Sequence, residues 1–294
     1  MGDRTTRAAD DQDPPDNDLA TTLPPRLIPT TFPQMAAPYL PQEIVEEIID
    51  ALVEDTESLL SCSLVSTGWI DRSRSHILAN VKLRSFSDLL FWFGTDLGRS
   101  SHHVRSLDLT QNHQYEWIVP RTLAASVNDF TSFHNVRSLT LINLDLTLFD
   151  EHSLTRFFGH FSGHLTSLSV QESTVDPHKL LFFVCMFPKL DNLELDNLTL
   201  GKTSKPPSGP TTLPRFRGKV TLLNIKPDAT AITAPFVDPP LLMAFRDVRV
   251  ENCRFETPKS LRDLFVACQK TAKKIKVARI YMGKLCLCCL FHQC

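Results

Sequence analysis

Cysteine and histidine are the residues of this sequence most suited to metal or thiol chemistry. Cys286, Cys288, Cys289 and Cys294 crowd the last nine residues together with His292. Zinc binds such ligands, but groups one and two residues apart cannot readily surround one tetrahedral ion, and a second ligand pair at a useful distance is missing. Lipid attachment beside a basic stretch is a second interpretation. The preferred interpretation is an irregular chain end without chemistry.

A pair of histidines and four further cysteines outside the last nine residues are also possible ligands. His160 and His164 stand four residues apart and could share one helix face, but two ligands are too few for a metal site, so we expect them to face solvent. No metal site is therefore predicted. In a chain without an export signal the scattered cysteines are expected to be reduced thiols. These cysteines are Cys62, Cys185, Cys253 and Cys268.

The sequence lacks the motifs of several known enzyme classes. Gly201-Lys202-Thr203 is similar to the end of a phosphate-binding loop, yet the glycine required five residues earlier is Asp196. Neither Gly-x-Ser-x-Gly nor His-Glu-x-x-His occurs. The 10 glycines among 294 residues are about half of the usual frequency of roughly 7%. We expect no enzymatic activity, no catalytic residue and no cofactor.

Charge and hydropathy place the chain among globular proteins. It has 31 basic and 33 acidic residues and 42% hydrophobic residues, which is enough for a sizeable core. The near-neutral balance disfavours nucleic-acid and membrane partners. The longest strong apolar run, Leu180 to Phe187, is far shorter than the roughly 18 residues that span a bilayer. An acidic N-terminus without a secretory signal predicts a cytoplasmic or nuclear location, or both.

The first 77 residues divide into a polar tail and a small helical unit. Residues 1–38 contain seven prolines and six aspartates but few apolar side chains. Such a segment cannot bury enough surface to offset its ordering entropy, so a disordered tail is predicted. Residues 39–77 have the apolar spacing of three short helices, with Ser66 as the N-cap of the third. So small a unit requires support from the rest of the chain or from a partner.

A second pattern, apolar-x-x-apolar-x-apolar, occurs eight times from residue 78 onward. The copies begin 25 to 32 residues apart, and helix-like stretches lie between them. The last two apolar residues of each copy are two apart and would share one face of a strand. This repeat predicts an α/β solenoid over residues 78–282, with an exposed loop at 201–218 and a Cys-rich irregular end at 283–294. The predicted strand pairs are Val81/Leu83, Leu107/Leu109, Leu139/Leu141, Leu168/Val170, Leu193/Leu195, Leu223/Ile225, Val248/Val250 and Ala278/Ile280.

Asparagine follows every second copy from the third onward, at Asn143, Asn197 and Asn252. An inward asparagine can bridge backbone groups of successive turns of a solenoid. The same residue can merely turn the chain after a strand. The sequence leaves both interpretations open.

Residues 40 to about 83 closely resemble an F-box, in the form common in mushroom-type fungi. The Leu40-Pro41 start, the amphipathic first helix, the Ser-Leu-Leu and Ser-Leu-Val-Ser blocks and Trp69 occur in the family's order. The resemblance implies docking to a Skp-type adaptor, and through it to a cullin, in a Skp-cullin-F-box ubiquitin ligase. The remainder of the chain would select an unidentified protein client, and other subunits would transfer ubiquitin.

Carried over by position, the resemblance implies adaptor contacts by apolar residues of this unit. A small unit with more apolar surface than it can hide also suggests association of a helix with a groove. Some of these side chains must form the unit's own core, and the sequence does not divide them. The implied contacts are Leu40, Pro41, Ile44, Val45, Ile48, Leu60, Leu64, Val65 and Trp69.

The eight copies resemble leucine-rich repeats. The fold class predicted is therefore a three-helix F-box followed by an α/β solenoid of irregular strand–helix repeats. Outward residues of the strands would form an extended interaction surface, which also includes Thr221 and Arg246. The client-binding candidates are Arg105, Asp108, Arg137, Thr140, Thr166, Ser169, Asp191, Glu194, Asn224 and Arg249.

Two other functions stay open at this point. The chain could be a repeat-based interaction scaffold without client turnover. Alternatively, the basic end could bind nucleic acid or a membrane surface, because six basic residues follow Asp263 with no acid among them. The preferred function is that of the substrate-recognition subunit of the ligase.

Overall fold

The computed structural model describes residues 40–111, 130–201, 218–225, 229–237, 246–269, 272–282 and 285–287. The chain divides into two units, Met1–Leu40 and Pro41–Cys294, and the described residues from Pro41 onward belong to the second. The predicted tail of residues 1–38 and nearly all of the predicted 201–218 loop lie outside the described residues, as do the ends of the Cys-rich segment.

The second unit begins with three short helices, which we call the N-terminal helices. Asp55 caps the second of them, because its side chain accepts a hydrogen bond from the Ser58 N–H at 3.1 Å. Ser66 occupies the predicted N-cap of the third, but its side chain makes no capping bond. The N-terminal helices are α1 (Gln42–Ala51), α2 (Thr56–Val65) and α3 (Thr67–Ile77).

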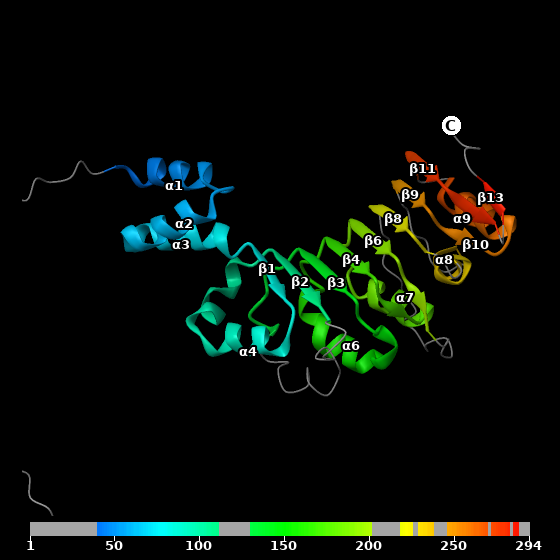
Figure 1. Cartoon of the computed structure of the whole chain (residues 1–294), viewed down its shortest axis with the longest axis horizontal. Helices are drawn as coiled ribbons and strands as arrows, with labels where there is room; N and C mark the ends of the chain where they lie inside the picture. The colour runs from blue at the N-terminus through cyan, green and yellow to red at the C-terminus, as the bar shows by residue number, and fades with distance from the viewer. Residues whose placement is uncertain are drawn as a thin grey trace, which may run out of the picture. The chain divides into compact units, whose positions relative to one another are not determined.

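An eight-stranded parallel sheet follows in the same unit, so the fold is α/β. The strands of this sheet lie side by side in chain order (Figure 1). The sheet is open, with β1 and β11 at its edges. Its strands are β1 (Asn80–Leu83), β2 (Ser106–Thr110), β3 (Ser138–Ile142), β4 (Ser167–Gln171), β6 (Asn192–Asp196), β8 (Lys219–Leu223), β9 (Asp247–Glu251) and β11 (Lys274–Ala278).

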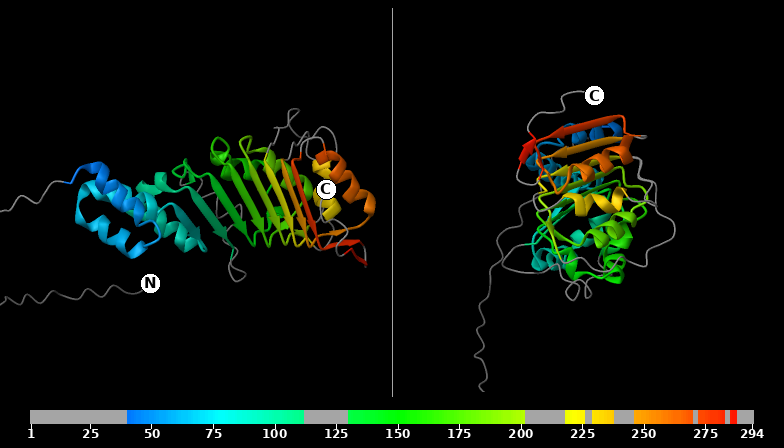
Figure 2. Two further views of the ribbon diagram at one scale, coloured as in Figure 1. Left: turned by 90° about the horizontal axis from the view of Figure 1, so that it is seen from above. Right: turned by 90° about the vertical axis from the view of Figure 1, so that its right-hand side faces the viewer.

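Helices cover one face of this sheet, as two further views show (Figure 2). The parallel direction of the strands requires the chain to return along that face after each strand. The predicted helix-like stretches coincide with α4, α6, α7 and α9. The helical segments are α4 (Phe86–Gly94), η1 (Asp96–His103), η2 (Leu146–Leu148), α6 (Glu151–Phe158), η3 (Gly159–Phe161), α7 (Pro177–Cys185), α8 (Ala229–Val237) and α9 (Pro258–Gln269).

Alternating burial along the strands forms the core. In β2, Leu107 and Leu109 are buried while the residues between and beside them are partly exposed. Register places Leu107 beside Leu139 of β3, which in turn lies beside Leu168 of β4. The predicted strand faces of the first five copies and of the seventh are confirmed by this burial. In the sixth copy, Val220 and Leu222 of β8 take these places, so the predicted pair was wrong there.

Aromatic side chains of α6, α7 and their neighbours fill the space under the middle of the sheet. The Phe183 ring meets Phe158 at 5.1 Å and Phe187 at 5.2 Å between centroids, both edge to face. All three side chains are buried. Edge-to-face pairs of this kind add to the stabilisation from area burial alone.

The chain turns in the left-handed conformation after each strand of the eight-stranded sheet from β3 to β11. Asn143, Asn197 and Asn252 have φ values of 59°, 49° and 56°, so they turn the chain. Asn143 also donates its side-chain amide to the Gln111 carbonyl at 2.7 Å, and so links neighbouring repeats. Both interpretations left open by the sequence therefore apply to Asn143. Glu172, Asn224 and Arg279 take the same conformation after β4, β8 and β11. The spacing of the asparagines did not predict these three turns.

The last strand pair was predicted three residues too late. Ile275 and Val277 of β11 lie beside Val248 and Val250 of β9, whereas Ala278 ends β11. Ile280 belongs to a separate three-stranded sheet. The short strands outside the main sheet are β5 (Thr174–Val175), β7 (Thr199–Leu200), β10 (Arg254–Phe255), β12 (Ile280–Met282) and β13 (Leu285–Leu287).

Among the described residues, no helix has both the length and the apolar character needed to cross a membrane.

Candidate functional site

The apolar residues of α1 separate into a buried and an exposed set. Val45 and Ile49 are buried against Leu59 of α2, and these three side chains are the buried core of the N-terminal helices. Ile44 and Ile48, one helical turn apart, are each 42% exposed. The helix therefore presents apolar residues both to its own core and to solvent.

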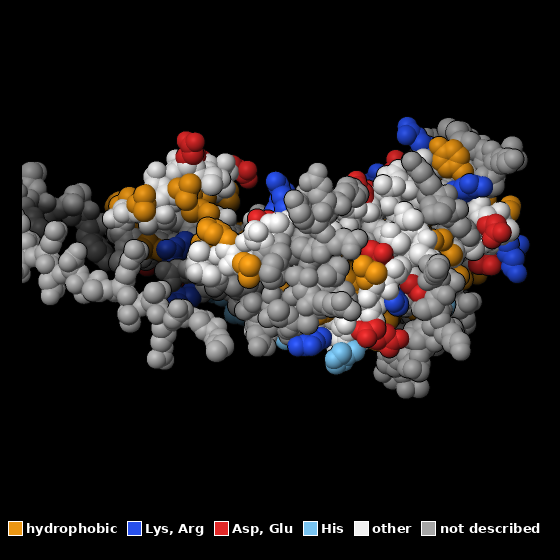
Figure 3. Space-filling view, turned by 60° about the horizontal axis from the view of Figure 1, so that its bottom comes forward, with side chains coloured by type: hydrophobic (Ala, Val, Ile, Leu, Met, Phe, Trp, Pro, Cys, Tyr) orange, Lys and Arg blue, Asp and Glu red, His pale blue; other side chains and the backbone are white. Residues whose placement is uncertain are grey.

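The second helix adds a larger exposed apolar area. Leu60, Leu64 and Val65 are 50%, 86% and 64% exposed. Leu60 and Leu64 are one turn apart on α2, so they lie on the same face. Figure 3 shows hydrophobic side chains gathered over the N-terminal helices. We call Ile44, Ile48, Leu60, Leu64 and Val65 the apolar strips.

The structure divides the apolar residues that were predicted to contact an adaptor into buried and exposed ones. Val45 is 4% exposed and belongs to the core, so it is removed from the contact set. Trp69 is partly buried and packs against the same core. Pro41 is exposed, and Leu40, which ends the other unit, is exposed as well. Val53, which the sequence analysis did not select, is also exposed.

Asp50 links α1 to α3 through two partners. Its carboxylate accepts hydrogen bonds from the Arg72 guanidinium, one of them at 2.6 Å to Nε, and lies 2.8 Å from the His76 Nε2. These bonds, Arg72 first and then His76, lower the pKa of Asp50 from 3.8 to about 2. The small core of the N-terminal helices is therefore supplemented by an ionic link.

This link predicts a pH dependence for the N-terminal helices. Because the folded pKa of Asp50 is below its unfolded value, its contribution is complete above about pH 4 and is lost as the pH falls toward 2. The effect is expected to be modest and salt-sensitive, since both side chains are partly exposed. Urea unfolding of these helices between pH 6 and 2, followed by hydrogen exchange of residues 42–77, measures it.

Asp50→Asn is expected to flatten that pH dependence. Asp247→Asn, at an exposed position at the start of β9, is the matched control and should retain it. Parallel curves for the wild type and Asp50→Asn would contradict the assignment.

The outward side chains of the sheet form a second surface, which we call the polar row. Register aligns Asp108, Thr140, Ser169 and Glu194 on successive strands. The row continues to Arg249, and ends with Lys82 and Lys276, which the sequence analysis did not select. Both lysines could have been selected from the sequence, because each stands between two apolar residues of a strand.

Charge along the polar row is uneven. Lys82 lies 3.7 Å from Asp108 at one edge of the sheet. Arg249 donates hydrogen bonds to Glu251 on its own strand at 3.1 and 2.5 Å. Thr140 and Ser169 give the row a neutral hydroxyl-bearing centre. A ligand that lies across the strands would therefore contact charged side chains toward both ends of the polar row and hydroxyl groups at its centre.

Other client candidates lie off this row. Arg105, Arg137, Thr166 and Asp191 precede their strands and are joined by backbone bonds, such as Arg137 N–H to Arg105 O at 2.8 Å. They form an exposed line along the sheet edge where the strands begin. Arg246 is also exposed, just before β9.

Two outward assignments are corrected by the structure. Asn224 is a turn residue whose amide donates to Asp196 at 2.8 Å and whose side-chain oxygen accepts from Asn252 at 2.5 Å. It joins neighbouring repeats, which explains its place outside the polar row. Thr221 is 2% exposed, so its side chain offers no surface although its register position is in the row.

No protein-family model matches this chain, and no curated protein matches it. The surfaces described above therefore carry the functional argument.

Four cysteines pack within or against the hydrophobic cores: Cys253 and Cys268 are buried, and Cys62 and Cys185 are partly buried. Cys62, Cys185 and Cys253 are free thiols. Burial raises the pKa of Cys185 to about 12 and the pKa values of Cys253 and Cys268 to about 11. Such thiols are protonated at neutral pH and are poor nucleophiles.

The predicted solvent-facing histidines His160 and His164 are exposed. A different group, Asp71, His102 and His103, brings together side chains that could hold a metal ion. Burial and the neighbouring His102 lower the pKa of His103. The adjacent histidines were visible in the sequence, but Asp71 joins them only through the packing of α3 against η1.

Proposed function

We propose that this chain is the substrate-recognition subunit of a Skp-cullin-F-box ubiquitin ligase. In this proposal the N-terminal helices are an F-box that binds a Skp-type adaptor, and the repeats are a leucine-rich-repeat-like solenoid that binds a protein client. The observation that carries it is the exposure of the apolar strips on helices that have only three buried core residues.

The energetics of these helices favour an apolar partner. Fully burying a Leu, Ile or Val side chain contributes about 1.5–3 kcal/mol, and the five residues of the apolar strips leave much of that contribution unused. Ile44 and Ile48 of α1, like Leu60 and Leu64 of α2, are one turn apart, which is the arrangement that a helix presents to a hydrophobic groove. The same residues coincide with the F-box resemblance in sequence.

The sheet supports the second half of the proposal. Sequential parallel strands, each followed by a left-handed turn, repeat every 25 to 29 residues from Asn143 to Arg279. Repeats that contact only their neighbours are typical of solenoids, whose strand surfaces bind extended ligands. The polar row and the exposed line from Arg105 to Asp191 would provide the client contacts.

The test is direct binding of the purified chain to a purified Skp-type adaptor. Leu60→Asp with Leu64→Asp is expected to reduce the affinity at least 100-fold, because two charged side chains would enter the apolar interface. Val266→Asp is the matched control, since Val266 is an exposed apolar residue of α9. The control variant should bind as the wild type does.

Circular dichroism of the double variant shows whether the helices remain folded, since both leucines are exposed. Equal adaptor binding by the folded double variant and the wild type would overturn the proposal. Adaptor-dependent ubiquitination of a co-purified protein would then separate a ligase subunit from a scaffold that only docks.

A further inference from the structure

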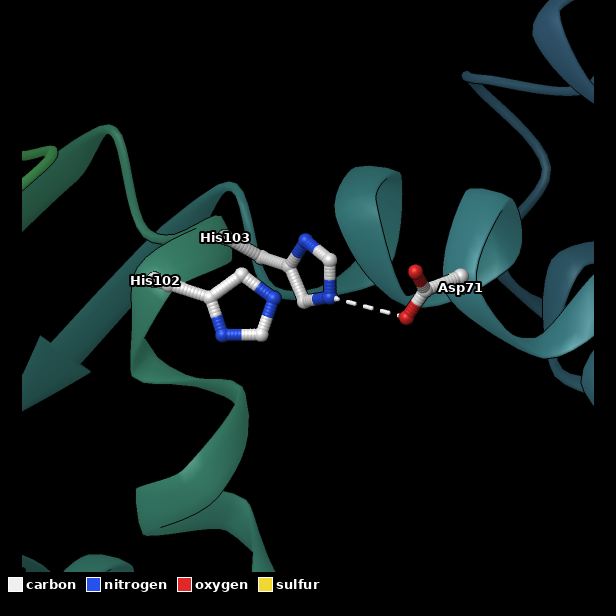
Figure 4. A group of neighbouring side chains, drawn as sticks. All are labelled: Asp71, His102 and His103. Atoms are coloured by element: carbon white, nitrogen blue, oxygen red, sulfur yellow. Dashed lines mark ion pairs between the residues drawn. The ribbon is translucent and has the colours of Figure 1, made fainter.

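A cluster of two histidines and one aspartate joins α3 to the end of η1. Each of Asp71, His102 and His103 offers one ligand atom, and these atoms all lie within 4.8 Å of one another. Figure 4 shows the two imidazole rings side by side, with a nitrogen of His103 facing the Asp71 carboxylate. The histidines stand more than 30 residues after Asp71 in the sequence, so the cluster is a product of folding.

The separation between His103 and Asp71 suits two ligands of a shared metal ion. The His103 Nε2 lies 3.5 Å from Asp71 Oδ1, which is longer than an ordinary N–H···O hydrogen bond. Two ligands of a tetrahedral zinc ion stand about 3.3 Å apart when each metal–ligand bond is about 2.0 Å. Asp71 is largely exposed, so a small rotation of its side chain could bring its oxygen to a common centre with both rings.

A backbone carbonyl orients the His102 ring. His102 Nδ1 lies 3.0 Å from the Arg99 carbonyl, to which it can donate, and this leaves Nε2 as the acceptor atom. A bond from the second ring nitrogen to a backbone carbonyl is the usual support of a metal-binding histidine. Asn135 also donates to the His102 carbonyl at 2.7 Å, which anchors the end of η1 to the following repeat.

We propose that Asp71, His102 and His103 form a zinc-binding site. Two imidazole nitrogens and one carboxylate oxygen supply three ligands of a type that zinc accepts, and water completes the coordination. Asp71 and His103 also line a cavity of about 600 Å³ that reaches Glu46 of α1, which gives solvent access to the site. The bound ion fastens α3 to η1 and so joins the N-terminal helices to the first repeat of the sheet.

Zinc and cobalt binding by the full-length chain tests this site. Titration calorimetry with zinc chloride should give one more bound equivalent for the wild type than for Asp71→Asn with His102→Ala. Cobalt should produce visible absorption bands of tetrahedral coordination that this double variant lacks. Zinc should also raise the thermal midpoint of the wild type more than that of the variant, because it binds the folded form.

Two controls separate this site from other ligands in the chain. Replacement of Cys286, Cys288, Cys289 and Cys294 by Ser removes the C-terminal thiols and should leave the extra equivalent in place. His160→Ala with His164→Ala removes two exposed histidines and should also leave it. Equal zinc stoichiometry in the wild type and the Asp71/His102 variant would overturn the proposal, as would loss of all bound zinc in the Cys variant. None of these measurements requires the adaptor, so the zinc-site proposal can be overturned without affecting the proposed function, and the reverse.

Discussion

Gly218→Ala is expected to destabilise the sheet by about 3 kcal/mol or more, at the upper end of the range for overpacking. A Cβ atom at Gly218 would lie 1.7 Å from the Asp191 carbonyl oxygen and 2.3 Å from its carbon. Because these are backbone atoms, the conflict cannot be relieved by moving a side chain. The Lys219 N–H donates to the same Asp191 oxygen at 2.7 Å, so β6 and β8 would separate where their pairing begins.

Urea unfolding measured by circular dichroism gives the size of this effect. Gly163→Ala is the matched control, because a Cβ at Gly163 meets no atom within 4 Å. The control should stay within about 0.5 kcal/mol of the wild type, as is usual for surface substitutions. Equal stability of the Gly218 and Gly163 variants would show that the two strands do not approach as described.

Phe183→Ala is expected to cost about 3–5 kcal/mol, the usual range for removal of a buried phenylalanine side chain. Phe183 is fully buried and lies between Phe158 and Phe187. Its removal leaves a cavity and abolishes the edge-to-face contacts that its ring makes with both of them. The expected result is a lower urea midpoint for the unfolding of the sheet and its helices.

Phe91→Ala provides the comparison for this prediction. Phe91 lies on α4 and is 63% exposed, so the same change of residue type removes little packing there. A Phe183 variant as stable as the Phe91 variant would contradict the assignment of Phe183 to the core.

The strands of the sheet were predictable because their signal is local. Leu107 and Leu109 are two residues apart, and this spacing alone places them on one face of a strand. The same spacing in the other copies predicted β3, β4, β6 and β9 correctly. In the sixth and eighth copies two neighbouring residues are both apolar, so the alternating pattern could be assigned to more than one pair of residues. Register with the neighbouring strands decides in favour of Val220 and Ile275.

The candidate surfaces were predictable in part. The sequence selected the apolar residues of the N-terminal helices but could not separate Val45 from Ile44, because adjacent residues of a short amphipathic helix both fit an apolar face. Likewise, Asn224 and Thr221 have outward positions in the pattern. The first is used by a turn and the second is buried. Burial and turn geometry depend on neighbouring segments that a local pattern does not contain.

The sequence by itself determined the α/β alternation, most of the strand faces and the resemblance of residues 40 to about 83 to an F-box. Only the tertiary structure decided which apolar side chains of the N-terminal helices reach solvent, and that Asp71 meets His102 and His103. The physical reason is the range of the interactions. Periodicity records contacts between residues two to four positions apart, whereas exposure and ligand clusters depend on segments that become neighbours only when the chain is packed.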